Sequence, residues 1–199
     1  MKNNSVRRLS MAAMMGAVAF VLMYFSFSIP VLSPFAELEL AALPELIGGF
    51  ILGPVGAIEI ICVKLLLKIV FKGSVSMMTG ELQNLILSLS YVLPAVIFYR
   101  RHRTKKGAIL GLVIGAVCSI VMAVLTNMYL ILPFYIKLYG MDWDAIVGMC
   151  AAANPWIKDI PTMIAFSIIP FNVVSRTIHS LLVILLYKKL SAPLKKFIQ

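Results

Sequence analysis

Long apolar runs alternate with short polar segments along the whole chain, and most of the runs are long enough to cross a bilayer. A crossing helix needs about 20 apolar residues to traverse roughly 30 Å of hydrocarbon. The pattern therefore predicts an all-α membrane protein, a bundle of six transmembrane helices that forms a single membrane domain over residues 1–199. The predicted spans are 9–29, 41–53, 54–72, 82–99, 107–133 and 160–187.

The second apolar run is short, and only Gly53-Pro54 separates it from the third. Glycine accepts unusual backbone dihedrals, and proline suits the first turn of a following helix. We therefore expect the second and third helices to form a hairpin whose turn lies on the inner side.

Basic residues mark one side of the predicted bundle. The net charge is +10, and Lys and Arg gather before the first span, between the fourth and fifth spans, and after the last span. This positive-inside pattern predicts that both termini are cytoplasmic, and it makes nucleic acid an unnecessary explanation of the charge. The residues concerned are Lys2, Arg7, Arg8, Arg100, Arg101, Arg103, Lys105, Lys106, Lys188, Lys189, Lys195 and Lys196.

Composition and missing motifs narrow the function classes. The chain is 61% hydrophobic, against roughly 45–50% in soluble domains, so its expected solvent is the bilayer of a cell membrane. It contains no GxxxxGK[ST], HExxH or GxSxG motif, which would indicate a phosphate loop, a zinc protease or a serine hydrolase. We expect no catalytic residues, no metal and no resident cofactor.

Polar side chains recur at helical spacing within the last predicted span. Asn172, Ser175, Arg176 and His179 lie at i, i+3, i+4 and i+7, which places them on one face. A charge at mid-membrane costs at least about 2.5–3.5 kcal/mol on insertion scales, so such residues usually face a partner or a wet cavity. Structural hydrogen bonding between helices is the alternative explanation.

The fourth and fifth spans carry matching polar residues. Glu81, Asn84, Ser88 and Tyr91 form a stripe along the fourth span, and Asn127 lies in the fifth. The segments 30–40, 73–80 and 134–159 face outward under the charge rule and can converge over one mouth. The pattern therefore predicts a polar pocket that opens outward.

The third span contains a row of lysines, Lys64, Lys68 and Lys72, at successive i+4 steps. Lysines near the end of a span can extend to the interface, but Lys64 is too deep for that. We expect it to pair with Glu45, with Glu81 or with an anionic part of a ligand.

Two alanines in the first span, Ala13 and Ala17, form an AxxxA pattern. Small residues one turn apart allow another helix to approach closely, either within the bundle or on a partner protein.

These features leave three function classes open. The chain could be the small-molecule-binding subunit of a transporter, a membrane-embedded enzyme that uses Glu81, Arg176 or His179, or a structural protein. Binding requires satisfied hydrogen bonds and a shaped apolar wall, whereas catalysis requires an acid, base or nucleophile close together. The residues present favour binding.

Four segments of the chain resemble the substrate-binding S components of energy-coupling-factor (ECF) transporters, most closely the riboflavin-specific type. The segments are LPELIGGFILGPVGAIEI at 43–60, GELQN at 80–84, TNMYLILPFY at 126–135 and IIPFNVVSRTIHSLLVILLYKKLS at 168–191. The resemblance implies a six-helix subunit of the bacterial plasma membrane that binds riboflavin at its outer face. It also implies a membrane coupling subunit and two cytoplasmic ATPases as partners, with Ala13 and Ala17 at the contact with the coupling subunit.

The resemblance also implies binding residues. Asn127 and Asn172 correspond to pocket asparagines, Glu81 and Asn84 line the same cavity, and Leu40, Ala41 and Leu43 form ring contacts and a gate. Ser175 stands where the family pattern leads us to expect Lys, with Arg176 next to it. Arg176 or Lys64 could meet a phosphate, so FMN is a secondary candidate ligand. Thiamine, biotin, folate or pantothenate would suit the same architecture.

Overall fold

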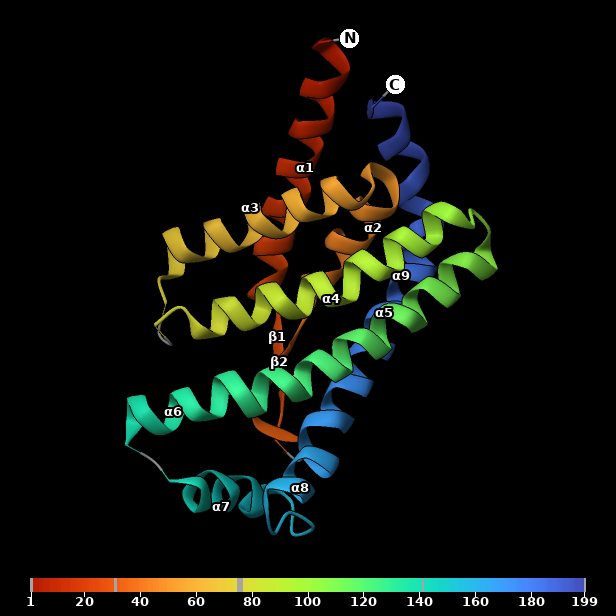
Figure 1. Ribbon diagram of the computed structural model, residues 1–199. Coiled ribbons are helices and arrows are strands. Elements are labelled where there is room, and N and C mark those ends of the chain that lie inside the picture. Colours follow the sequence, from red (N-terminus) through yellow and green to blue (C-terminus); the bar gives the residue numbers. More distant parts are fainter. Residues whose placement is uncertain (1, 31, 75–76, 141, 199) are drawn as a thin grey trace.

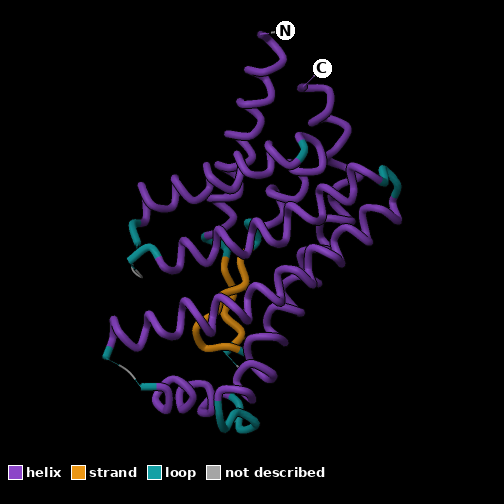
Figure 2. Tube along the Cα trace, in the orientation of Figure 1, coloured by secondary structure: helices purple, strands orange, loops and turns teal. Residues whose placement is uncertain are grey.

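The computed structural model describes residues 2–30, 32–74, 77–140 and 142–198, which form a helical bundle around one β-hairpin (Figures 1 and 2). The first part of the chain contains α1 (Lys2–Met23), β1 (Ser26–Ile29), β2 (Ser33–Glu39), α2 (Ala42–Leu52) and α3 (Pro54–Lys72). The remainder contains α4 (Thr79–Arg101), α5 (Lys105–Thr126), the π-helical turn η1 (Asn127–Ile131), α6 (Leu132–Tyr139), α7 (Trp143–Ala153), α8 (Ile160–Met163), the π-helical turn η2 (Ile164–Ile168) and α9 (Ile169–Ile198).

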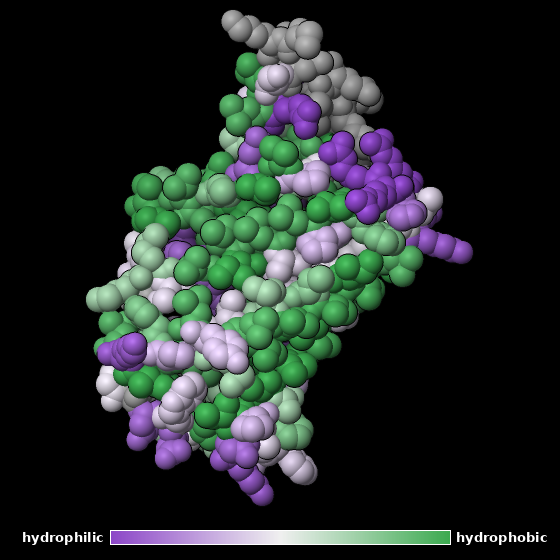
Figure 3. Space-filling model, viewed as in Figure 1, coloured by the Kyte–Doolittle hydropathy of each residue, from purple (hydrophilic) through white to green (hydrophobic). Residues whose placement is uncertain are grey.

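Helices occupy all six predicted apolar runs, but they differ in how well they suit a membrane crossing. Four segments of the described chain are long and apolar enough: Ser5–Met23, Thr79–Arg101, Lys105–Leu138 and Ile160–Tyr187. α3 has 19 residues but carries several charges, and α2 has 11, about 16 Å. In the view of Figure 3, hydrophobic side chains cover the middle of the molecule and hydrophilic ones gather at its ends.

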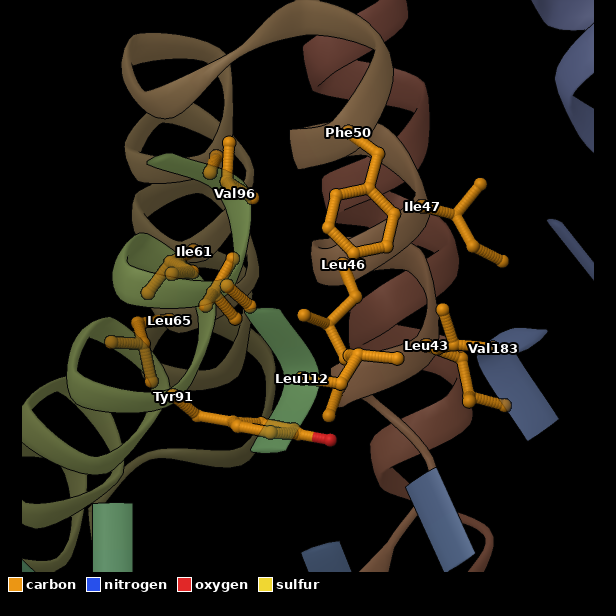
Figure 4. Close-up of a cluster of buried hydrophobic side chains, with 14 residues drawn as sticks. Leu43, Leu46, Ile47, Phe50, Ile61, Leu65, Tyr91, Val96, Leu112 and Val183 are labelled. Carbon is orange, nitrogen blue, oxygen red and sulfur yellow. The ribbon is translucent and has the colours of Figure 1, made fainter. Parts of the chain in front are cut away.

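The short helix α2 forms the centre of the main hydrophobic core. Ten of its residues are buried, and Leu46, Ile47 and Phe50 pack among side chains from α3, α4, α5 and α9 (Figure 4). A helix that is apolar on all sides is stable only when it is enclosed. The neighbouring helices therefore shield α2, which explains why a run too short to span roughly 30 Å by itself is nonetheless helical.

Close packing between α4 and α5 depends on glycine. A Cβ added at Gly111 would lie 2.7 Å from the carbonyl oxygen of Ala95, and one added at Gly115 would clash with the carbonyl oxygen of Tyr91. The backbones of the two helices therefore approach as closely as membrane helices with small interfacial residues do.

The predicted turn between the second and third helices is confirmed. Gly53 has a φ of +92° and Pro54 occupies the first turn of α3. The guanidinium of Arg8 donates to the Leu52 carbonyl oxygen at 2.9 Å, which ties the start of α1 to this turn.

The β-hairpin corrects the prediction of a purely α-helical fold. Its strands pair antiparallel, with Ser26 opposite Glu39 and Phe27 opposite Leu38. The first predicted span, 9–29, therefore extends too far, because α1 ends at Met23 and the chain turns into β1. The segment that forms α7 was likewise expected to be part of an outer loop, but it is helical. Asp142 caps this helix by accepting a hydrogen bond from the Ala145 N–H at 2.8 Å.

Candidate functional site

A cavity of about 360 Å³ lies where the hairpin meets the later helices. Its wall combines β2, α4, the continuous α5–η1–α6 segment, α7 and the η2–α9 segment. All three segments predicted to face outward contribute, through Glu37, Gly80 and Cys150 among others. The volume falls within the range of about 300–1,000 Å³ that is usual for small-molecule sites.

Two asparagines of the cavity wall lie close to the two π-helical turns. Asn127 begins η1, and its amide nitrogen donates to the Ala123 carbonyl oxygen at 2.7 Å. Asn172 follows η2, and its amide nitrogen donates to the Ile168 carbonyl oxygen at 2.9 Å. Each bond uses one amide hydrogen, so the Oδ1 atom and the second N–H of each side chain remain available. π-Helical turns frequently occur at functional sites.

A polar network joins the hairpin to the buried helices behind the cavity. Asn84 donates to the Glu39 carboxylate at 2.6 Å and accepts from the Lys64 ammonium at 2.6 Å. Lys64 also forms an ion pair with Glu45 at 2.5 Å, and both side chains are 1% exposed. Of the two carboxylates considered from sequence, Glu45 is therefore the one that pairs with Lys64.

Arg176 reaches the cavity over an aromatic ring. Its guanidinium carbon lies 4.9 Å from the centroid of Tyr91, a cation–π geometry. Its Nε atom is buried and has no hydrogen-bond partner within the described residues. The neighbouring His179 donates from Nε2 to the Glu39 carbonyl oxygen at 2.7 Å, which fixes its tautomer and leaves Nδ1 as an acceptor.

Half of the binding residues predicted from sequence line this cavity, and they come from three elements of the fold, α4, η1 and α9. Ser88 and His179, which the helical spacing placed in the same stripes, line it as well. The predicted binding residues at the wall are Asn84, Asn127, Asn172, Ser175 and Arg176.

Two of the predicted binding residues, both charged, lie behind the cavity wall and do not line it. Lys64 is enclosed between Glu45, Asn84 and Ser88. Glu81 pairs with Lys68 at 3.0 Å and accepts from the Ser74 hydroxyl at 2.7 Å. Their charges are matched within the protein, so any effect on a ligand passes through the residues in front of them.

The predicted gate residues also lie outside the lining. Ala41 is fully buried against α1 residues, and Leu40 and Leu43 belong to or pack against the main core. Ala42 lines the cavity instead, because successive side chains at the start of a helix point about 100° apart.

Comparison with known proteins decides the family. Residues 7–187 match the family described as the ECF transporter, substrate-specific component. This chain belongs to that family. The riboflavin transporter RibU of Staphylococcus aureus (strain TCH60) is 33% identical over 96% of this S component and 93% of that protein. The riboflavin transporter FmnP of Bacillus subtilis (strain 168) is 25% identical over 93% and 92% of the two chains.

A solved structure agrees with the family assignment. The S component of a bacterial ECF transporter superposes with a TM-score of 0.74 at 30% identity, over 96% of this chain and 99% of that one. The arrangement of helices around the hairpin is therefore an S-component fold, and the resemblance drawn from the four sequence segments is confirmed.

The small residues of α1 in this S component divide between two faces. Ala12 is 1% exposed, and a Cβ added at Gly16 would lie 2.6 Å from the side chain of Val63 on α3. Ala13 and Ala17 lie on the exposed side of the helix. Internal packing is thus served by Ala12 and Gly16, whereas Ala13 and Ala17 face away from the bundle.

Sequence reasoning missed several cavity residues of this S component. Tyr135 and Cys150 come from segments read as outer loops, and Gln83 lies beside the predicted stripe of α4. Asp142 was a usable signal for α7, because Asp is a preferred N-cap residue ahead of an apolar run. Recognition of α7 would have brought Cys150 into consideration.

Proposed function

We propose that this S component binds riboflavin in the cavity and takes it up with an ECF energising module, formed by a membrane coupling subunit and two cytoplasmic ATPases. Relatives named as riboflavin transporters support the ligand, since they align over 92–93% of their own length. The observation that carries the proposal is the group of three asparagines and one guanidinium around a cavity in an otherwise apolar bundle. We assign the chain no catalytic role and no resident cofactor.

The chemistry of the wall suits riboflavin. The isoalloxazine ring is flat and largely apolar, and its pyrimidine edge offers both donors and acceptors. Asn127 and Asn172 can match that edge, because an amide presents both kinds of group. Leu87, Ile131 and Phe171 supply apolar contact, and polar residues of α4 and α9 suit the ribityl hydroxyls.

The enclosed residues act in this proposal by positioning the wall. Lys64 orients the amide of Asn84 by donating to its Oδ1 atom, and Glu81 holds Lys68, which lines the cavity. Leu40, Ala41 and Leu43 fix the start of α2, where Ala42 faces the ligand.

The proposed topology has six passes, with α2 as a short one, and both termini in the cytoplasm of a bacterial cell. The bond from Arg8 to Leu52 and the approach of Arg100 to Gly53 support it, because they gather basic residues at one end of the bundle. The cavity is lined by the opposite end of α4, by η1 and α6 beyond the far end of α5, and by α7, so it would open outward. The exposed face at Ala13 and Ala17 would then contact the coupling subunit.

FMN is a second candidate ligand. The buried Nε atom of Arg176 has no hydrogen-bond partner within the described residues, and a guanidinium in the cavity wall can bind a phosphate. Lys64 contributes less to this possibility than the sequence suggested, since Glu45 already neutralises it.

The decisive experiment is a binding titration with the purified protein. Flavin fluorescence should be quenched by the protein at a one-to-one ratio, and the preparation should carry the visible absorption of bound flavin. FMN, thiamine, biotin, folate and pantothenate serve as competitors. Failure to quench riboflavin while another vitamin binds would reassign the ligand, whereas strong competition by FMN would establish the second candidate.

A further inference from the structure

A second cavity, of about 420 Å³, lies between the α4–α5 turn and α9 and shares no lining residue with the first. One part of its wall is apolar and comes from Ile109 and Leu112 of α5 and from Val183 and Ile184 of α9. Ile109 is 46% exposed and Ile184 is 40% exposed. The apolar part of the cavity is therefore open along the bundle surface that hydrocarbon chains would contact.

Another part of the wall of this cavity consists of aromatic side chains, two of which have hydroxyls that can form hydrogen bonds. The ring of Tyr99 lies 4.7 Å from that of Phe50, and the hydroxyls of Tyr99 and Tyr187 are 3.0 Å apart. One hydroxyl donates to the other, so the second O–H remains for an oxygen of a bound molecule. Tyrosines with an apolar body and a polar tip are typical of the membrane interface.

The rim of the cavity is cationic and not neutralised by the protein. Arg103 and Lys105 line it and are exposed, and neither forms an ion pair with another described residue. The first turn of α5 contains no acidic residue, although the positive end of a helix dipole favours acidic groups there. Figure 3 shows hydrophilic side chains gathered at this turn beside the hydrophobic surface. An anion at the rim would therefore be attracted by Arg103, by Lys105 and by the positive end of the α5 dipole.

We propose that this cavity binds an anionic phospholipid of the adjoining leaflet. The phosphate would lie between Arg103 and Lys105, the tyrosine pair would donate to a headgroup or ester oxygen, and an acyl chain would follow Ile109 and Ile184. Basic pockets between transmembrane helices bind anionic lipid headgroups by this combination of charge and apolar contact. The site is separate from the flavin cavity, and the proposal holds whichever vitamin is transported.

Lipid binding to the purified, delipidated full chain tests the proposal. Dioleoyl phosphatidylglycerol and dioleoyl phosphatidylcholine are added in mixed micelles, and bound lipid is counted by native mass spectrometry. We expect a preference for phosphatidylglycerol, and we expect Arg103→Gln combined with Lys105→Gln to reduce its affinity about tenfold to thirtyfold, with phosphatidylcholine little affected. Equal binding of the two lipids by the unmodified chain would overturn the proposal.

Matched variants distinguish a specific lipid site from nonspecific electrostatic attraction of the lipid to the basic turn. Arg101→Gln combined with Lys106→Gln removes the same charge from the same turn, at residues outside the cavity lining, and should leave phosphatidylglycerol affinity within about twofold. Ile109→Trp should fill the apolar slot and weaken binding, whereas Ile114→Trp on the same helix should not. Equal losses in both charge pairs, or displacement of the lipid by glycerol phosphate alone, would contradict a built lipid site. Thermal unfolding in detergent provides an independent check that each variant is folded.

Discussion

The bundle contains two halves that share the same long helices but differ in what lies between them. In the packed half, α2 lies among α1, α3, α4 and α9, and most contacts are made by hydrophobic side chains and glycines (Figure 4). In the cavity half, the hairpin, η1, α6, α7 and η2 separate these helices, and asparagine, serine and arginine face the space. The polar side chains thus lie where close packing ends, on helices that the packed half holds in position.

Lys64 lies at the boundary between the two halves, and its replacement should have the largest effect. Lys64→Met leaves the carboxylate of Glu45 buried without its partner, so we expect the free energy of unfolding to fall by about 3–5 kcal/mol. Lys68→Met is the matched control, because its ion pair with Glu81 is partly exposed and should cost about 1 kcal/mol or less. Denaturant titration in detergent measures both, and equal losses would contradict the distinction.

Substitutions in the cavity half should change riboflavin affinity and leave the free energy of unfolding nearly unchanged. Asn127→Ala and Asn172→Ala should each weaken riboflavin binding by about 1–3 kcal/mol, because a buried hydrogen-bonding group of the ligand loses its partner. Thr126→Ala is the control, since its hydroxyl bonds to the Met122 and Ala123 carbonyls and it does not line the cavity. Fluorescence titration gives the affinities, and unchanged values for both asparagine variants would leave them a purely structural role.

The packed half should show the reverse behaviour. Gly115→Ala forces the α4 and α5 backbones apart, so we expect a loss of about 1–3 kcal/mol in unfolding free energy with flavin affinity retained at low temperature. Gly148→Ala in α7 meets no atom within 4 Å and should instead stabilise by up to about 1 kcal/mol through helix propensity. Thermal unfolding compares the pair. A neutral Gly115→Ala would show that the α4–α5 contact tolerates expansion.

Substitutions on the exposed face of α1 in the packed half should affect transport and not ligand binding. Ala17→Leu adds bulk to an exposed position, so riboflavin affinity should stay constant while uptake into cells falls at least about tenfold, the effect of losing about 1.4 kcal/mol at the docking contact. Ala152→Leu in α7 adds the same bulk elsewhere on the exposed surface and should leave uptake unchanged. Loss of affinity in Ala17→Leu would point to internal packing instead.

The smallest effect concerns pH at the edge of the cavity half. The N–H and hydroxyl of Thr162 donate to Asp159 at the start of α8, and these bonds hold the pKa of Asp159 below its ordinary value of 3.8. Because the folded-state pKa is the lower one, the contribution to stability is present above the ordinary value and is lost as the pH falls through the folded value. Asp159→Asn should therefore flatten the acid limb of the unfolding profile slightly, and an unchanged limb would contradict this linkage.

The helices and half of the candidate wall could be predicted because they depend on periodicity within single segments. Arg176 and Asn172 are four residues apart and so share one face of an α-helix, and Asn84 follows from the stripe in α4. The hairpin was missed because Ser26–Ile29 follows the apolar run of α1 without a break. The alternation of Phe25, Phe27 and Ile29 with two serines is a period-2 strand pattern and was the available signal. The choice of Glu45 as the partner of Lys64 also depends on how α2 packs on α3, which no local pattern contains.

The continuous helical segment Lys105–Leu138 has a mechanical consequence for the surrounding membrane. Its 34 residues extend over about 51 Å at 1.5 Å per residue, well beyond the roughly 30 Å of a hydrocarbon core. The segment must therefore lean, bend or carry one end past the lipid headgroups, or the bilayer must thicken locally around it. Lipid chain length therefore influences how this segment, which carries the cavity residue Asn127, sits in the membrane.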